Sequence, residues 1–170
     1  MSNKALIIID IQRDYFAGGQ FELFNTQAVL DNIIAATKSA QEQSIPVILV
    51  QHVADETQGP SAFFNANTSG VEIHPELLAV AADAPVVVKT FSDSFEQTSL
   101  QSLLEGLNID ELLVCGMMTQ NCVTHTAISK VAEQYKVSII ADCCTSSDAM
   151  IHNIALHGVS HRIPLIEMPQ

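Results

Sequence analysis

The stretch Leu112-Leu113-Val114-Cys115-Gly116-Met117-Met118-Thr119-Gln120-Asn121-Cys122-Val123 decides the fold class of this chain. It opens with a continuous apolar run, turns at Gly116, and enters a helical pattern that continues through Ala127 to Val131. An apolar strand followed by a glycine turn and a helix is the repeating unit of sheets whose parallel strands are connected by helices. We therefore expect Cys122 in the first turn of a helix that follows a buried strand.

Further apolar, β-branched runs lie on both sides of this stretch. Together with it they cover residues 5–9, 46–50, 85–88, 112–115 and 137–141, and a weaker sixth run lies near 162–166. Runs that are apolar throughout are typical of parallel strands covered on both faces. Helical periods separate them, with apolar positions at Leu30, Ile33, Ile34 and Thr37 and again at Leu100, Leu103, Leu104 and Leu107.

The alternation of strands and helices predicts an α/β fold. We expect a Rossmann-like doubly wound sheet of about six parallel strands flanked by helices, and the length of 170 residues predicts one domain, residues 1–170. The helix near residue 100 has predicted ends as well: Thr98 and Gln101 fit a capping box, and Asn108 can adopt the left-handed conformation after the last turn.

Charge and composition exclude several classes of partner. The chain carries 7 basic and 19 acidic residues, a formal charge of −12, which disfavours nucleic acid and anionic membrane surfaces. The first apolar run is too short for a signal peptide or a membrane span. With four cysteines and no zinc-binding spacing among them, we expect reduced thiols and a cytoplasmic protein.

Chemically active side chains follow the predicted strands. Asp10 follows the first strand and Lys89 the third, while Cys122 follows the fourth after the glycine turn. In doubly wound sheets, ligands bind outside the carboxyl ends of the strands, so these three residues are candidates for one site. A helix N-terminus and a nearby ammonium would both lower the pKa of Cys122 and favour a nucleophilic thiolate.

Each of these residues also has a structural interpretation. Asp10 could accept backbone N–H bonds in a loop, Lys89 could extend to the surface, and Cys122 could be a buried structural cysteine. The sequence pattern leaves these alternatives open.

The ordered set Asp10-Ile11-Gln12-Arg13-Asp14, Lys89 and residues 116–123 resembles the isochorismatase-like superfamily of cysteine hydrolases. The resemblance extends to residues 70–75, to Ser94-Phe95, to Thr126-Ala127 and to Asp142, and so covers nearly the whole chain. It implies a triad in which Asp10 takes the thiol proton, Lys89 organises the charges, and Cys122 attacks the substrate carbonyl.

Further features follow from the resemblance alone. It implies a cis peptide between Met117 and Met118 and an oxyanion hole made by the backbone N–H groups of Met118 and Cys122. It implies a small-molecule amide substrate cleaved through a covalent acyl-enzyme, with no cofactor, and a homo-oligomer, either dimer or tetramer.

The chain departs from some branches of this superfamily. Isochorismatases proper typically lack the nucleophilic cysteine, which disfavours that activity. Nicotinamidases in the same superfamily resemble the chain but hold a metal through an Asp-x-His element and a further histidine. Here residues 51–55 depart from that element, and only His74 has an obvious counterpart. His52, Asp55 and His74 are weak candidates for a metal site, with polar loop residues as the alternative. Ile128 stands where many relatives carry arginine, which disfavours a substrate with a free carboxylate.

Pocket residues are predicted from their places near the strand ends. The candidates are Tyr15, Phe16, Phe63, Phe91, Phe95 and Thr119, although aromatic side chains are more often core residues. The long segment 51–84 is either a lid or pocket wall or an ordinary surface excursion. For the adjacent Cys143 and Cys144 we expect packing rather than a redox pair.

Two hypotheses follow for the function. The first is a hydrolase that cleaves an amide-type C–N bond through Cys122. The alternative is a redox-sensing or ligand-binding protein that uses an activated Cys122 without turnover.

Overall fold

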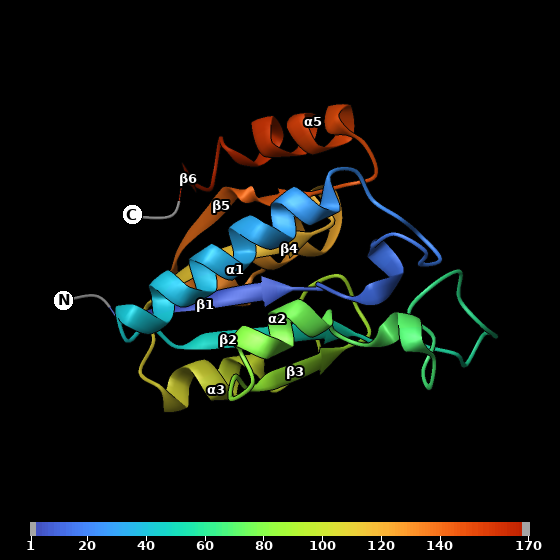
Figure 1. Cartoon of the computed structure of the whole chain (residues 1–170). Coiled ribbons are helices and arrows are strands. Elements are labelled where there is room, and N and C mark those ends of the chain that lie inside the picture. The colour runs from blue at the N-terminus through green and yellow to red at the C-terminus, as the bar shows by residue number, and fades with distance from the viewer. Residues whose placement is uncertain (1–2, 168–170) are drawn as a thin grey trace.

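The computed structural model describes residues 3–167 and contains one sheet of six parallel strands (Figure 1). The strand order is β3-β2-β1-β4-β5-β6, so the first and fourth strands lie side by side in the middle. The strands are β1 Lys4–Ile9, β2 Val47–His52, β3 Val86–Lys89, β4 Glu111–Met117, β5 Lys136–Thr145 and β6 Leu165–Ile166. All six apolar runs are therefore strands, and the predicted fold class is confirmed.

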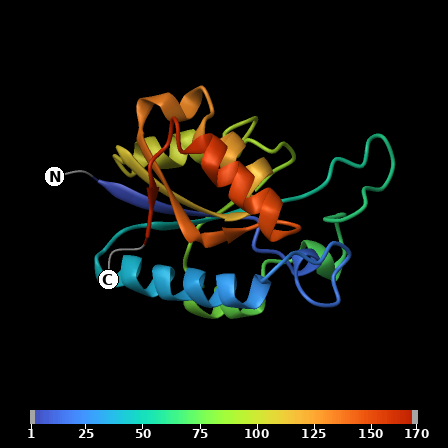
Figure 2. The ribbon, with the colours of Figure 1, turned by 90° about the horizontal axis from the view of Figure 1, so that it is seen from above.

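Helices cover both faces of this sheet. They are α1 Thr26–Glu42, α2 Pro75–Val80, α3 Leu100–Gly106, α4 Thr124–Ala127 and α5 Ala149–Val159. Figure 2 shows α1 and α2 on one side of the sheet and α3 and α5 on the other. From β1 the strands follow one another outward to β3, the chain then returns to β4 beside β1, and the strands continue outward to β6. The topological switch point lies between β1 and β4, where this class of fold binds its ligands.

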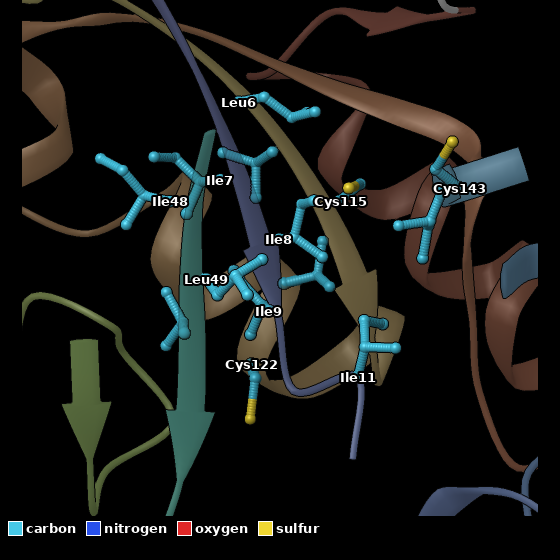
Figure 3. Packing of buried hydrophobic residues seen from close by; sticks show 14 of the residues in the cluster. Leu6, Ile7, Ile8, Ile9, Ile11, Ile48, Leu49, Cys115, Cys122 and Cys143 are labelled. Atoms are coloured by element: carbon cyan, nitrogen blue, oxygen red, sulfur yellow. The ribbon is translucent and has the colours of Figure 1, made fainter. Parts of the chain in front are cut away.

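The core is centred on β1, where every residue from Ala5 to Ile9 is at most 1% exposed. Figure 3 shows Leu6, Ile7, Ile8 and Ile9 packed beside Ile48 and Leu49 of β2. Central strands have helices on both faces and neighbours on both edges, which explains their continuous apolar sequence.

The edge strand β3 differs from the prediction. Val86 and Val88 are 44% and 52% exposed, whereas Val87 and Lys89 are buried, so burial alternates along the strand. An edge strand can be stable with only one face buried against a helix. The prediction from the apolar run that both faces of β3 are buried is therefore wrong.

The helix predicted from Val123 to Val131 is interrupted. A π-helical turn, η3 Thr119–Val123, leads into α4, which ends at Ala127, and a separate 3-10 turn, η4, covers Val131–Gln134. The apolar spacing was correct, but it spans two short segments rather than one helix.

The ends of α3 confirm one prediction and correct another. Asn108 has φ of 55°, the left-handed conformation that was expected. The capping box is wrong, because the Thr98 hydroxyl accepts from the N–H of Leu100 and the Gln101 amide donates to Glu105 instead of reaching back. The helix α2 lies inside the long segment 51–84 and was not predicted.

Loops 11–25 and 53–74 extend beyond the carboxyl ends of the strands (Figure 1). A short 3-10 turn, η1 Arg13–Tyr15, lies in the first loop and another, η2 Ser69–Val71, in the second. No helix in the described part of the chain combines the length and apolar character that crossing a membrane requires.

Candidate active site

Asp10 lies at the point where β1 ends. Its φ is 56°, a left-handed conformation that aspartate tolerates better than most residues, and this turns the chain at the sheet edge. Ile9, the residue before it, is in register with Gly116 of β4. Asp10 is thereby placed beside the start of the turn that carries Cys122.

Gly116 is required by a close approach of two strands. Its φ of 129° is unfavourable for residues with a side chain, and a Cβ at this position would overlap the carbonyl oxygen of Ile9. The next peptide bond, between Met117 and Met118, is cis, at the position that the resemblance implies. The chain then enters η3, which contains Cys122.

Lys89 is the last residue of β3 and connects the other two. Its Nζ lies 3.2 Å from Asp10 Oδ2 and 3.2 Å from Cys122 Sγ. All three side chains are buried, with Asp10, Lys89 and Cys122 exposed by 0%, 2% and 3%. Figure 3 shows the sulfur of Cys122 pointing away from the apolar cluster at the ends of the strands, rather than into the core. The structure thus brings the three predicted residues together.

Burial dominates the pKa values of this cluster. It raises the pKa of Asp10 above its ordinary value, although the Lys89 ammonium opposes the shift. The pKa of the Cys122 thiol is also raised, by burial and by the Asp10 carboxylate, which together outweigh Lys89. The expected low-pKa thiolate is therefore wrong for the resting protein.

A fourth side chain, His52 at the end of β2, belongs to this cluster. His52 Nδ1 lies 2.8 Å from Lys89 Nζ, and the carbonyl oxygen of Phe91 accepts from the same ammonium at 2.9 Å. Sequence reasoning considered His52 only as a weak metal ligand. The available signal was that His52 and Lys89 end neighbouring strands, where parallel pairing places them side by side.

The metal site suggested by His52, Asp55 and His74 does not form. The Asp55 carboxylate is exposed and accepts from the N–H of Thr57, and His74 Nδ1 accepts from the N–H of Glu76 at the start of α2. Within residues 3–167, the donor atoms that converge to within 4.8 Å are those of Asp10, His52 and Cys122. The Lys89 ammonium contacts all three, so a cation already lies among these donors.

The predicted pocket aromatics occupy different environments. Tyr15 is buried and packs against Phe63, with ring centroids 5.5 Å apart, and Phe16 packs against His74 at 4.4 Å. Phe91 is 44% exposed next to the cluster. These side chains remain predicted pocket walls.

Phe95 and Thr119 contact other parts of the fold, and their place in the pocket stays a prediction. Phe95 stacks on Tyr135, just before the start of β5, which is the opposite edge of the sheet from Cys122. The Thr119 hydroxyl lies 2.7 Å from His152 Nδ1 and donates to the carbonyl oxygen of Thr145. These contacts connect η3 to α5 and β5, so both side chains have structural partners.

The other cysteines lie apart from the cluster. Cys143 and Cys144 are buried with free thiols, and Figure 3 shows Cys115 beside Ile8 and Cys143 farther from Cys122. Burial raises the pKa of Cys144 to about 12. These thiols are therefore protonated packing residues.

Comparison with known proteins gives a consistent result over most of the chain. The family model for the Isochorismatase domain matches residues 4–166. An uncharacterised isochorismatase family protein of Bacillus subtilis is 35% identical over 150 residues, covering 88% of this chain and 81% of that protein. The nicotinamidase of Escherichia coli is 29% identical over 179 aligned positions, covering 85% of this chain and 84% of that enzyme.

Solved structures share the fold. A cysteine hydrolase from Pseudomonas syringae superposes with a TM-score of 0.88 at 22% identity, covering 98% of this chain and 89% of that one. A nicotinamidase from Bacillus subtilis superposes with a TM-score of 0.84 at 24% identity, covering 97% and 99%. At these identities the similarity establishes the architecture alone.

Proposed function

We propose a reaction for this chain, which belongs to the isochorismatase family and is a hydrolase of that family. The protein cleaves an amide-type C–N bond of a small molecule through a covalent Cys122 acyl-enzyme. The observation that carries the proposal is the buried Lys89 ammonium, 3.2 Å from both the Asp10 carboxylate and the Cys122 sulfur. A nucleophile, a base and a fixed positive charge thus converge at the edge where this fold binds ligands.

In the proposed reaction, the proton of the thiol is transferred as the sulfur attacks, which agrees with the raised pKa values of Asp10 and Cys122. Asp10 takes the proton of the Cys122 thiol as the sulfur attacks the carbonyl carbon, so the carboxylate loses its charge while the sulfur gains one. Lys89 contacts both atoms and balances the negative charge before and after the transfer. A free thiolate is never required in the resting state.

The remaining steps follow from the same three groups. The tetrahedral intermediate collapses when the amine leaves with the proton held by Asp10, and a thioester to Cys122 remains. Asp10 then removes a proton from water, which attacks the thioester and releases the acid. The net reaction consumes one amide and one water, and yields one acid and one amine.

The oxyanion of that intermediate requires hydrogen-bond donors. We assign this role to the backbone N–H groups of Met118 and Cys122, which lie in the turn after the cis peptide. Donors of this kind contribute on the order of 10²–10³ in rate in well-studied hydrolases. Because the donors are backbone groups, the identity of the Met118 side chain is of little importance.

The substrate class that fits best is a small neutral amide. The resemblance places Ile128 where many relatives carry arginine, and Ile128 directly follows the last residue of α4 and is 37% exposed. Two relatives named above are nicotinamidases, so nicotinamide belongs in the first set of compounds to test.

The alternative of a redox sensor has less support. Sensor cysteines are accessible and have low pKa values. Cys122 is 3% exposed and its pKa is raised. Formation of a sulfenic acid under mild peroxide without ammonia release from any amide would favour this alternative.

The test is a panel of small amides, including nicotinamide, assayed for ammonia release. The wild-type protein should hydrolyse at least one compound, with a Cys122 adduct of the acyl mass trapped by acid quenching and mass spectrometry. Cys122→Ala should lose activity by about 10³-fold or more, as expected for removal of a covalent nucleophile. Cys144→Ala is the matched control, because it removes another buried thiol and should retain activity. Equal rates for Cys122→Ala and the wild type would refute the proposal.

We also propose that the chain forms a homo-oligomer. Met150 and Ile154 lie one turn apart on α5 and are 72% and 65% exposed, so they offer an apolar surface that a second copy of the chain would cover. Light scattering should give a mass of two or more times 18.4 kDa. A mass of one chain at assay concentration would contradict the proposal.

A further inference from the structure

The Lys89 ammonium has three N–H groups and four possible acceptors. Three of them meet hydrogen-bond geometry: His52 Nδ1 at 2.8 Å, the Phe91 carbonyl oxygen at 2.9 Å and Cys122 Sγ at 3.2 Å. Asp10 Oδ2 lies 3.2 Å away as an ion pair, but neither Asp10 oxygen accepts a hydrogen bond of good geometry from the described residues. The other three acceptors therefore set the direction of the ammonium N–H groups. The Asp10 carboxylate interacts with the ammonium mainly through charge.

His52 is held rigidly in this place. It is in register with Lys89 on the adjacent parallel strand, so both side chains project on the same side of the sheet. The Gln12 side chain accepts from the backbone N–H of His52 and donates to its carbonyl oxygen, both at 2.8 Å, and Gln12 is fully buried. This paired contact extends the end of β2 and fixes the backbone of His52.

The hydrogen bond defines the state of the imidazole. An ammonium has only protons to give, so Nδ1 must be the unprotonated acceptor and the proton of the neutral ring lies on Nε2. Burial and the neighbouring Lys89 charge lower the pKa of His52 to about 4, so the ring stays neutral at ordinary pH. His52 is therefore a constant acceptor rather than a second base.

We propose that His52 is a positioning residue for the hydrolysis: by accepting one Lys89 N–H, it directs the ammonium toward Cys122 Sγ and weakens its hydrogen bonding to Asp10. This inference rests on the proposed function, in which Asp10 is the base. A carboxylate that accepts a hydrogen bond from an ammonium is a weaker base than one that is only near it, since hydrogen bonding favours the charged form. His52 thus preserves the basicity of Asp10.

The groups around Asp10 make this effect specific. Lys89 and Cys122 are the titratable groups in contact with it. Tyr15 also faces the cluster, but burial and the charges of Asp10 and Asp14 raise the pKa of its phenol, so it stays neutral. Lys89 is therefore the cation whose direction can change the basicity of Asp10.

The test compares His52→Leu with His52→Asn. Leucine removes the acceptor, whereas the Asn side-chain oxygen can take the place of Nδ1. The readout is the rate of Cys122 alkylation by iodoacetamide as a function of pH, located by peptide mass spectrometry, which needs no substrate. If His52→Leu does not fold by circular dichroism, His52→Gln replaces it, because its longer side chain places the acceptor elsewhere.

His52→Leu should alkylate about tenfold more slowly at neutral pH, with the acid limb of the profile about one pH unit lower, since one pKa unit corresponds to a factor of ten. His52→Asn should stay within about threefold of the wild type with an unshifted limb. When a substrate from the amide panel is in hand, His52→Leu should lower kcat and leave KM nearly unchanged.

Three outcomes would overturn the inference. They are a wild-type rate and profile for His52→Leu, a slower rate with an unshifted acid limb, and an Asn variant as impaired as the Leu variant. Failure of the amide panel would count against the proposed function, whereas the alkylation profile tests the coupling of His52 to Asp10 and Cys122 on its own.

Discussion

At the scale of single residues, the buried charges of Asp10 and Lys89 are the feature most costly to the stability of the fold. Both side chains are essentially inaccessible, and removing ions from water costs several kcal/mol each unless they are paired. We therefore attribute the buried pair to its role in the proposed reaction. Removing either partner leaves the other charge buried and unpaired, which destabilises the fold.

Lys89→Met should lower the free energy of unfolding by about 3 kcal/mol at neutral pH, because the Asp10 carboxylate is left without its cation. Adding Asp10→Asn to that variant removes the uncompensated charge and should recover most of the loss. Urea denaturation measures both. Both variants should be inactive, and additive losses in the double variant would contradict this account of the pair.

His52 predicts a dependence of stability on pH. Its pKa is about 4 in the folded protein and near 6.5 when unfolded, so between these values the unfolded chain binds more protons. The free energy of unfolding therefore falls as pH drops from 6.5 toward 4, by about 2 kcal/mol after allowance for partial exposure.

The measurement is urea unfolding of the wild type and His52→Asn across that range. The variant should show a shallower decline. The pKa values of His74 and His152 are also lowered, but these residues are common to both proteins and cancel in the difference. Parallel curves would mean that His52 is not neutral in the folded state.

At the scale of secondary-structure elements, the link from β4 to η3 determines where the nucleophile lies. Gly116 pairs with Ile9, and the chain bends immediately after it into the turn that holds Cys122. The contact between Gly116 and Ile9 therefore positions both Asp10, which follows Ile9, and η3, which contains Cys122.

Gly116→Ala should destabilise the protein by about 3 kcal/mol or more and reduce Cys122 alkylation, because the new Cβ overlaps the Ile9 carbonyl and the backbone must shift. Gly158→Ala is the matched control. Gly158 lies in the last turn of α5 with open space around it, so alanine should stabilise the helix by up to about 1 kcal/mol. Thermal unfolding measures the stability of both variants. Equal changes in stability would refute the argument.

Individual elements were predictable to different degrees. The apolar runs predicted β1, β2 and β4, because their burial on both faces leaves a continuous pattern. The helix after Cys122 was predicted too long, since spacing cannot reveal a π-helical turn or the break after Ala127. The helix α2 was missed because it is short and lies in a long connection.

At the scale of the whole molecule, the net charge of −12 opposes compaction. One of the 7 basic residues, Lys89, is buried against Asp10 and does little to neutralise the surface. Like charges on the surface repel through water, and this repulsion is reduced by salt.

Raising NaCl from about 10 mM to about 150 mM should increase the free energy of unfolding on the order of 1 kcal/mol, because it shortens the range of surface repulsion. Choline chloride should act similarly, which excludes binding of sodium. A decrease in stability with salt would show that exposed ion pairs, such as Arg13 with Glu72, outweigh the repulsion.

The sequence by itself determined the parallel α/β fold and the identity of Asp10, Lys89 and Cys122 as candidates. It could do so because burial imposes local patterns on strands, and because parallel strands end at a common edge. The tertiary structure alone decided that burial raises the pKa of the Cys122 thiol, that Thr119 and Phe95 contact His152 and Tyr135, and that His52 contacts Lys89. These depend on strand order, side-chain direction and solvent exclusion, which arise from contacts between residues far apart in the chain and leave no local pattern.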